Sequence, residues 1–152
     1  RHAGRASRRI RSLMRLVLDT NVVASALLRV VRHALLQPRF EQRIALFTSL
    51  PLLAELGDIL GRRKFEKKIA ASMMSVDQLV SGYSSLAAVV RPVNVDRIAP
   101  DPDDDVVIGT ALAASAERVV TGDHGLLSIG AYRGVQIISV SEMLAILDLA
   151  PC

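Results

Sequence analysis

Two aspartates in this chain follow short apolar runs that lie far apart in the sequence. Asp19 follows the run 16–18, and Asp123 follows the run 119–122, which ends in Thr121 and Gly122. Both runs are typical of buried strands. In an open α/β sheet the carboxyl ends of the strands border the ligand crevice. Two carboxylates at that edge predict a metal site, and a metal site favours an enzyme.

A third acid, Glu55, lies in an expected helix over 49–62. It stands one turn after Leu52 and one turn before Ile59, which belong to the apolar stripe of that helix, so it borders the buried face. A helix-surface charge at the edge of the core is the simpler interpretation of Glu55 taken alone.

Four more acids stand at the start of an expected helix over 101–116, where residues 101–105 read Asp-Pro-Asp-Asp-Asp. Acids at a helix N-terminus satisfy free N–H groups and complement the helix dipole, which explains Asp101 and Asp103. Asp104 and Asp105 lie deeper in the first turn, and both could face the edge of the sheet. Helix geometry alone does not separate them.

Carboxylates gathered in one crevice repel each other. A pair about 4 Å apart costs on the order of 4 kcal/mol at an effective dielectric constant near 20. A hard divalent cation would neutralise such a cluster, and ligation by oxygen alone favours Mg²⁺ or Mn²⁺ over Zn²⁺. Each aspartate could instead cap the helix that follows its strand, but that interpretation weakens when all the acids are taken together.

The elements that would position these acids alternate between strand and helix. We expect strands over 15–19, 44–48, 118–121 and 135–139, and helices over 22–36, 49–62, 65–73, 75–90, 101–116, 124–129 and 141–149. Pro92 ends the fourth helix or begins a brief strand. This alternation predicts an α/β fold, a three-layer α/β/α sandwich around a central parallel sheet.

Length and composition favour one globular domain. The chain has 152 residues, of which 51% are hydrophobic and 22% charged. Its formal net charge of +4 comes from residues 1–13, which hold five arginines and no acid, and the rest of the chain has a net charge of −1. We therefore expect a basic leader over 1–13, disordered or non-native, followed by one domain over 14–150.

The composition argues against a disulfide-stabilised protein, a membrane protein and a protein that binds nucleic acid by base stacking. The single cysteine, Cys152, permits no disulfide framework, and no apolar run reaches 18 residues, so we expect a cytoplasmic protein with no membrane contact. Aromatic residues make up 3% of the chain, which argues against nucleic-acid binding by base stacking on aromatic side chains.

The ordered set of motifs resembles the PIN-domain ribonucleases, in particular the single-domain toxins of the VapC type. The motifs are Leu-Asp-Thr-Asn-Val at 18–22, Leu-Leu-Ala-Glu-Leu at 52–56, and an aspartate followed 18 residues later by that of Val-Thr-Gly-Asp at 120–123. The resemblance covers about 14–147. It implies a PIN-like sandwich and a metal-dependent endoribonuclease that hydrolyses RNA phosphodiester bonds, the toxin of a type II toxin–antitoxin pair.

The resemblance also assigns residues and partners. Asp19, Glu55, Asp105 and Asp123 would be the catalytic, metal-binding quartet for Mg²⁺ or Mn²⁺, and the 18-residue spacing selects Asp105 over Asp104. The supporting polar residues would be Asn21 and Thr121. The implied partners are an RNA substrate, a small antitoxin protein and a second copy of the chain in a homodimer.

One position departs from the family pattern. Many relatives carry another acid two residues after the last aspartate, where this chain has Gly125. That change leaves open a one-metal or a two-metal mechanism. It also supports an alternative function, a catalytically weak PIN-like module that binds RNA or a protein partner. A Mg²⁺ phosphatase of the haloacid dehalogenase type fits poorly, because it needs an acid where Asn21 stands.

Cleavage of RNA requires cationic surface, because phosphate contacts dominate binding. A basic cluster follows the Glu55 helix, and an ordinary solvated face is the simpler interpretation of it. Its members, the candidate RNA-binding residues, are Arg62, Arg63, Lys64, Lys67 and Lys68. A second group lies at Arg29, Arg32, Arg39 and Arg43.

Overall fold

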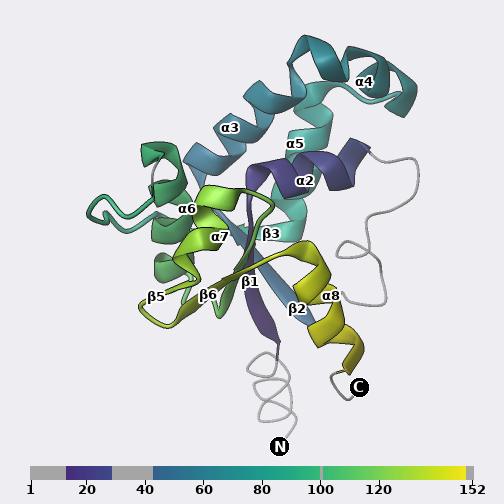
Figure 1. Ribbon diagram of the computed structural model, residues 1–152. Helices are drawn as coiled ribbons and strands as arrows, with labels where there is room; N and C mark the ends of the chain where they lie inside the picture. The colour runs from purple at the N-terminus through teal and green to yellow at the C-terminus, as the bar shows by residue number, and fades with distance from the viewer. Residues whose placement is uncertain (1–12, 29–42, 100, 150–152) are drawn as a thin grey trace, which may run out of the picture.

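A six-stranded sheet forms the centre of the protein, in a computed structural model that describes residues 13–28, 43–99 and 101–149 (Figure 1). The strand order is β3-β2-β1-β4-β6-β5. All neighbours pair in parallel except β5 and β6, which are antiparallel. The strands are β1 (Met14–Leu18), β2 (Ile44–Thr48), β3 (Ala87–Val89), β4 (Arg118–Val120), β5 (Ala131–Tyr132) and β6 (Val135–Ile138).

Helices cover both faces of this sheet, which confirms the expected α/β/α sandwich. They are α2 (Thr20–Leu28), α3 (Leu50–Leu60), α4 (Glu66–Ser72), α5 (Val76–Leu86), α6 (Pro102–Ala113), α7 (His124–Ile129) and α8 (Val140–Leu149), with a 3₁₀ turn η3 at Arg63–Phe65. In Figure 1, α6 and α7 lie on one side of the sheet, and α2, α5 and α8 lie on the other.

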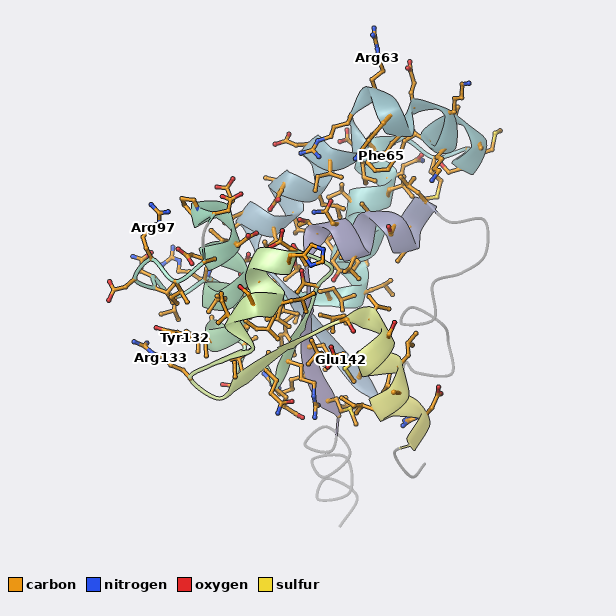
Figure 2. The ribbon with its side chains drawn as sticks, in the orientation of Figure 1. Arg63, Phe65, Arg97, Tyr132, Arg133 and Glu142 are labelled. Carbon is orange, nitrogen blue, oxygen red and sulfur yellow. The ribbon has the colours of Figure 1, made fainter. Side chains whose placement is uncertain are left out.

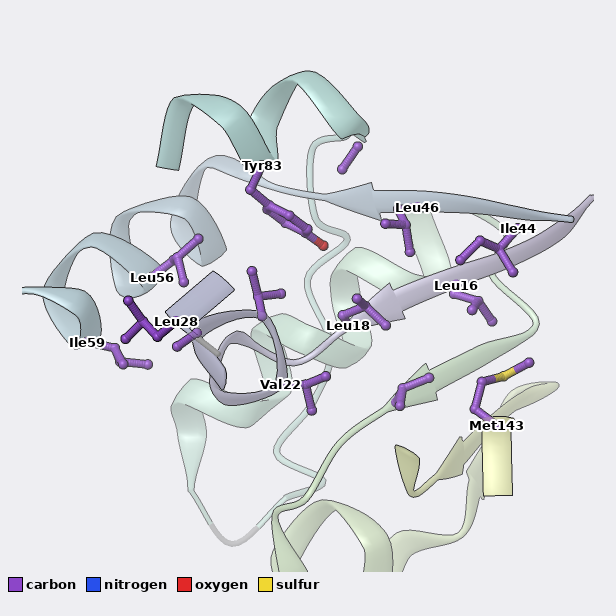
Figure 3. Packing of buried hydrophobic residues seen from close by; sticks show 14 of the residues in the cluster. Leu16, Leu18, Val22, Leu28, Ile44, Leu46, Leu56, Ile59, Tyr83 and Met143 are labelled. Atoms are coloured by element: carbon purple, nitrogen blue, oxygen red, sulfur yellow. The ribbon is translucent and has the colours of Figure 1, made fainter. Parts of the chain in front are cut away.

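The central strand β1 shows how the sequence produces two cores. Successive side chains of a strand point to opposite faces. Leu16 and Leu18 therefore pack in the cluster with α2, α3, α5 and α8, which Figure 3 shows, whereas Val17 packs with α6 and α7. All three side chains are at most 2% exposed. The continuous apolar run thus marks a strand that is buried on both faces.

The region after Tyr83 differs from the expected helix over 75–90. Helix α5 ends at Leu86, and residues 87–89 form the edge strand β3 instead. These three residues pair in parallel with Leu46, Phe47 and Thr48 of β2. The next residue, Val90, extends the pairing, because its N–H donates to the carbonyl of Thr48 at 2.8 Å. Tertiary pairing with β2 prevails here over the helical pattern.

Other boundaries shift for local reasons. Helix α6 ends at Ala113, and the last helix is capped by Ser139 rather than Ser141, because Ser139 Oγ accepts the N–H of Glu142 at 3.1 Å. The short antiparallel strand β5 was not expected. Some of the expectations concern residues outside the described ranges. They are the extension of the first helix over 29–36, nearly all of the basic leader, and the side chains of Cys152, Arg29, Arg32 and Arg39.

None of the helices in the described ranges has the length and apolar character needed to cross a membrane.

Candidate active site

Asp19 lies at the carboxyl end of β1, the central strand, and its side chain is buried. Its backbone carbonyl starts α2 by accepting the N–H of Val23 at 3.1 Å. Its carboxylate accepts two short hydrogen bonds, from Thr121 Oγ1 to Oδ2 at 2.7 Å and from the N–H of Thr20 to Oδ1 at 2.8 Å. Burial raises the pKa of Asp19, and these hydrogen bonds oppose that rise.

Thr121 connects Asp19 to Asp123. The Thr121 hydroxyl donates to Asp19 and accepts the backbone N–H of Asp123 at 3.0 Å. Asp123 in turn caps α7, with Oδ2 accepting the N–H of Leu126 at 2.9 Å. Asp123 can therefore cap a helix and also belong to the site, because its carboxylate has further lone pairs that can accept hydrogen bonds or bind a cation.

Glu55 reaches the same edge from α3. Its carboxylate hydrogen-bonds the Thr20 side chain, and the Thr20 hydroxyl also lies 3.5 Å from Asp19 Oδ1. Partial burial raises the pKa of Glu55, and the negative charges of Asp19, Asp103 and Asp101 add to that rise. Thr20 thus links two acids that are 36 positions apart in the sequence.

Asp104 is the acid of α6 that joins this group. Partial burial and the charges of Asp123, Asp19 and Asp101 raise its pKa to about 7. A hydrogen bond between the carboxyl groups of Asp104 and Asp123 contributes, because it requires a proton on one of them. Such a rise is expected where partly buried carboxylates lie close together.

The structure does not bring Asp105 to this group, contrary to the expectation from the 18-residue spacing. The side chain of Asp105 turns to the segment before α6, where Oδ1 accepts the N–H of Ala99 at 2.8 Å and of Ile98 at 3.2 Å. Successive residues of a helix point about 100° apart. Asp104 and Asp105 therefore cannot both face the edge of the sheet, and Asp104 occupies the place expected for Asp105.

The supporting residues have different positions. Thr121 is fully buried between two acids, whereas Asn21 is exposed on α2 and makes no side-chain hydrogen bond with the described residues. Sequence reasoning missed the role of Thr20, whereas helix geometry left Asp104 open and the family resemblance selected Asp105 in its place. The signal that could have found Thr20 is its place directly after Asp19 at the end of the first strand.

The donor chemistry of the site suits a hard divalent cation. Asp19, Asp104, Asp123 and Glu55 offer carboxylate oxygens, and three of them have raised pKa values that a cation would reverse. Within the described ranges, however, no three His, Cys, Asp or Glu side chains converge closely enough to hold one ion. The donor types therefore fit Mg²⁺ or Mn²⁺, whereas the positions of the described carboxylates do not form a closed set of ligands.

The basic cluster forms the far end of a helical arm that extends α3 away from this site. Arg62, Arg63, Lys64, Lys67 and Lys68 are all exposed, and none of them forms an ion pair within the described part of the chain. Lys64 lies 5.0 Å from the ring centre of Phe65, and Figure 2 shows Arg63 pointing away from the body of the protein. The arm thus presents five positive charges, with the single acid Glu66 among them.

By its fold and site, the protein is an α/β protein with a mostly parallel sheet and a cluster of acids at the carboxyl edge of the central strands. The family model of the PIN domain matches residues 15–125, which include Asp19, Glu55, Asp104 and Asp123. The chain belongs to the PIN domain family, whose members are typically metal-dependent nucleases. No curated protein and no solved structure gave a significant match.

Proposed function

We propose that this protein is a metal-dependent endoribonuclease that hydrolyses RNA phosphodiester bonds. One observation carries the proposal: Asp19, Asp104 and Asp123 come from three separate elements and meet at one edge of the sheet, where partial burial of Asp104 and the nearby charges of Asp123 and Asp19 raise its pKa to about 7. A fold that maintains such repulsion at the edge of its sheet gains by binding a divalent cation there. Family membership supports the same conclusion.

In this proposal Asp19, Asp104 and Asp123 hold Mg²⁺ or Mn²⁺, and Glu55 completes the ligand shell or orients the attacking water. The bound ion would neutralise the carboxylates and activate a water for attack on phosphorus. Thr121 and Thr20 are positioning residues, because each donates a hydroxyl hydrogen bond that fixes an acid. Asn21 stands next to Thr20, and its amide, which has no hydrogen-bond partner among the described residues, is available to a bound phosphate.

Arg62, Arg63, Lys64, Lys67 and Lys68 would hold RNA phosphates away from the cleaved bond. Arg62 lies seven residues after Glu55 along α3 and its cap, about 10 Å along a helix axis. This distance suits contacts with nucleotides that flank the cleavage point. These five cations outnumber Glu66, the one acid within the segment 62–68, and this excess of positive charge supports an anionic partner.

The biological role that we propose is the toxin of a type II toxin–antitoxin pair, acting in the cytoplasm as a homodimer. A small antitoxin would cover the acidic site, and its positive side chains would offset the repulsion there. Support comes from the resemblance of the motif set to VapC-type toxins. A short open reading frame directly upstream of the gene, whose product co-purifies and inhibits cleavage, is the expected result, and its absence would contradict the role.

Thermal unfolding in chelator and in millimolar Mg²⁺ or Mn²⁺ tests the metal site first. A ligand that binds the folded state alone raises its stability by mass action. We expect the wild-type midpoint to rise with metal, and the midpoint of Asp19→Asn/Asp104→Asn to stay constant. Metal-dependent cleavage of RNA should be lost in the same double variant while its fold persists. Unchanged cleavage would refute the assignment.

A second candidate function is a catalytically weak module that binds RNA or a protein. Gly125 favours it, because many relatives have an acid at that position. This alternative predicts RNA binding with no metal-dependent turnover. Turnover that requires Asp19 and Asp104 would exclude it.

A further inference from the structure

We propose that a groove beside the acidic site binds one nucleobase of the RNA next to the cleaved bond. The groove, of about 440 Å³, lies between the start of α3, the start of α6 and the segment 92–97. This inference rests on the proposed function and adds to it a site that would select the base next to the cleaved bond. The volume falls within the range of small-ligand pockets.

The groove and the acidic site are built on the same two helices. Pro51 lines the groove and lies one turn before Glu55 on the same face of α3. Pro102 and Asp105 also line it, and they flank Asp104 in the first turn of α6. A nucleotide in the groove would therefore lie next to a phosphate at the acids.

The outer wall of the groove is held rigidly. The N–H of Val93 donates to the carbonyl of Gly109 at 3.0 Å, and the carboxylate of Asp105 binds the N–H groups of Ile98 and Ala99. A Cβ on Gly109 would lie 2.3 Å from the Val93 carbonyl oxygen, so only glycine permits this approach. Asp105 thus positions the groove wall, in place of the metal role expected for it, and a preformed wall lowers the entropy cost of binding.

The lining suits a base better than a phosphate. Pro51, Pro92 and Val93 line the groove with apolar surface against which a planar ring can pack. The carboxylate of Asp105 at the inner end disfavours a phosphate there. Asn94 is exposed at the groove, and its amide makes no hydrogen bond with the described residues, so it can bind a base edge through one donor and one acceptor.

The outer rim carries positive charge. Arg97 lines the groove, and Figure 2 shows it on the outer side of this segment. Arg91 is exposed on the adjoining surface that shares Pro51 and Pro92 with the groove. This arrangement orients a nucleotide with its base inside and its phosphate at the rim, and it needs no aromatic platform in a chain with 3% aromatic residues.

The test measures binding without catalysis. The metal-free full chain is titrated with AMP, GMP, CMP, UMP and inorganic phosphate, and the backbone amides of 93–98 are followed by NMR. We expect shifts that depend on the base and that inorganic phosphate does not reproduce. Equal shifts with phosphate alone, or no shift with any nucleotide, would overturn the proposal.

Two exposed amide residues provide a matched pair of variants. Asn94→Ala should weaken binding of the preferred nucleotide by roughly 3- to 10-fold, the effect of one or two lost hydrogen bonds. Gln136→Ala on β6, an exposed amide away from the groove, should change nothing. An equal loss in both variants would overturn the proposal.

The two proposals can fail separately. Nucleotide binding in the groove with no cleavage of RNA would leave the groove site standing and refute the nuclease. Metal-dependent cleavage with no preference for any base beside the cut, together with no nucleotide binding, would refute the groove site alone.

Discussion

The hydroxyl of Thr121 lies 2.7 Å from Oδ2 of Asp19, although 102 positions separate the two residues in the chain. Parallel pairing of β1 with β4 creates this contact, because it aligns Leu18 with Val120 and brings the residues after both strands to one edge. The same hydroxyl accepts the N–H of Asp123. One side chain thereby fixes the positions of two of the acids.

Asp104 and Asp105 are neighbours with opposite expected roles, so their asparagine variants form a matched pair. Asp104→Asn should abolish both the metal-induced rise in melting temperature and RNA cleavage, because it removes a proposed ligand. Asp105→Asn should keep the metal response but unfold about 2–4 °C earlier, since a buried charged acceptor becomes neutral at a cost of about 1 kcal/mol. Calorimetry with and without Mg²⁺ measures both effects. A metal response lost only in Asp105→Asn would restore the assignment from spacing.

The stability of the metal-free protein should fall as pH rises from about 4 to 7. The pKa of Asp104 is about 7 in the folded protein and 3.8 in its ordinary state, so the folded state binds more protons in this range. Stability from this group is complete below the unfolded pKa and is lost as pH rises through the folded pKa. Burial raises the pKa values of Asp19 and Glu55 in the same direction.

Asp104→Asn is the control for this pH dependence. It should flatten the decline and raise the stability of the chelated protein at pH 7.5, because the repulsion with Asp123 disappears. Chemical denaturation at pH 5, 6, 7 and 8 gives the slope. An Asp104→Asn variant with the same slope as the wild type would show that Asp104 does not titrate in this range.

Alanine substitutions at two helical glycines should change the stability of the protein in opposite directions. Gly109→Ala should destabilise the protein by about 1–3 kcal/mol, because its Cβ would collide with the Val93 carbonyl. Gly57→Ala should stabilise it by about 0.5–1 kcal/mol, since the nearest atom to its Cβ, in Val80, is 4.0 Å away and alanine favours a helix. Urea denaturation measures both, and a neutral Gly109→Ala would contradict the close packing of 92–93 on α6.

Tyr83 places a hydroxyl in the apolar core without a hydrogen-bond partner among the described residues, and burial raises its pKa strongly (Figure 3). Tyr83→Phe removes that group and keeps the ring. We expect unchanged stability or a gain of about 1 kcal/mol, because no hydrogen bond is lost. A loss above 1 kcal/mol would reveal a partner for the hydroxyl, such as a buried water.

The helical arm should control the salt dependence of RNA binding. Replacing Lys64, Lys67 and Lys68 by alanine should weaken binding and reduce the slope of log K against log[salt] by about 2, since each phosphate contact on a single strand contributes about 0.7. Arg133→Ala is the control, because Arg133 is exposed in the turn between β5 and β6 and packs on Tyr132. An unchanged slope in the triple variant would exclude the arm from the RNA interface.

Local patterns in the sequence were sufficient for the architecture and for part of the site. Buried strands, helix caps and the alternation of elements predict the sandwich, and the position of Asp19 and Asp123 after parallel strands predicts that they share one edge. Stripe geometry also places Glu55 at the border of the core. These features depend on residues close in sequence, and on the general rule that parallel strands end on the same side.

Only the tertiary structure decided which acid of α6 joins the site, that 87–89 forms a strand, and that Thr20 links Asp19 to Glu55. The rotation of a helix about its axis depends on what packs against it, and for α6 that is the carbonyl of Val93 against Gly109 and the hydroxyl of Ser49, 2.9 Å from that of Thr110. Both Asp104 and Asp105 satisfy the same local pattern. The long-range contacts that turn one toward the acids and the other toward the groove wall are not encoded in spacing along the chain.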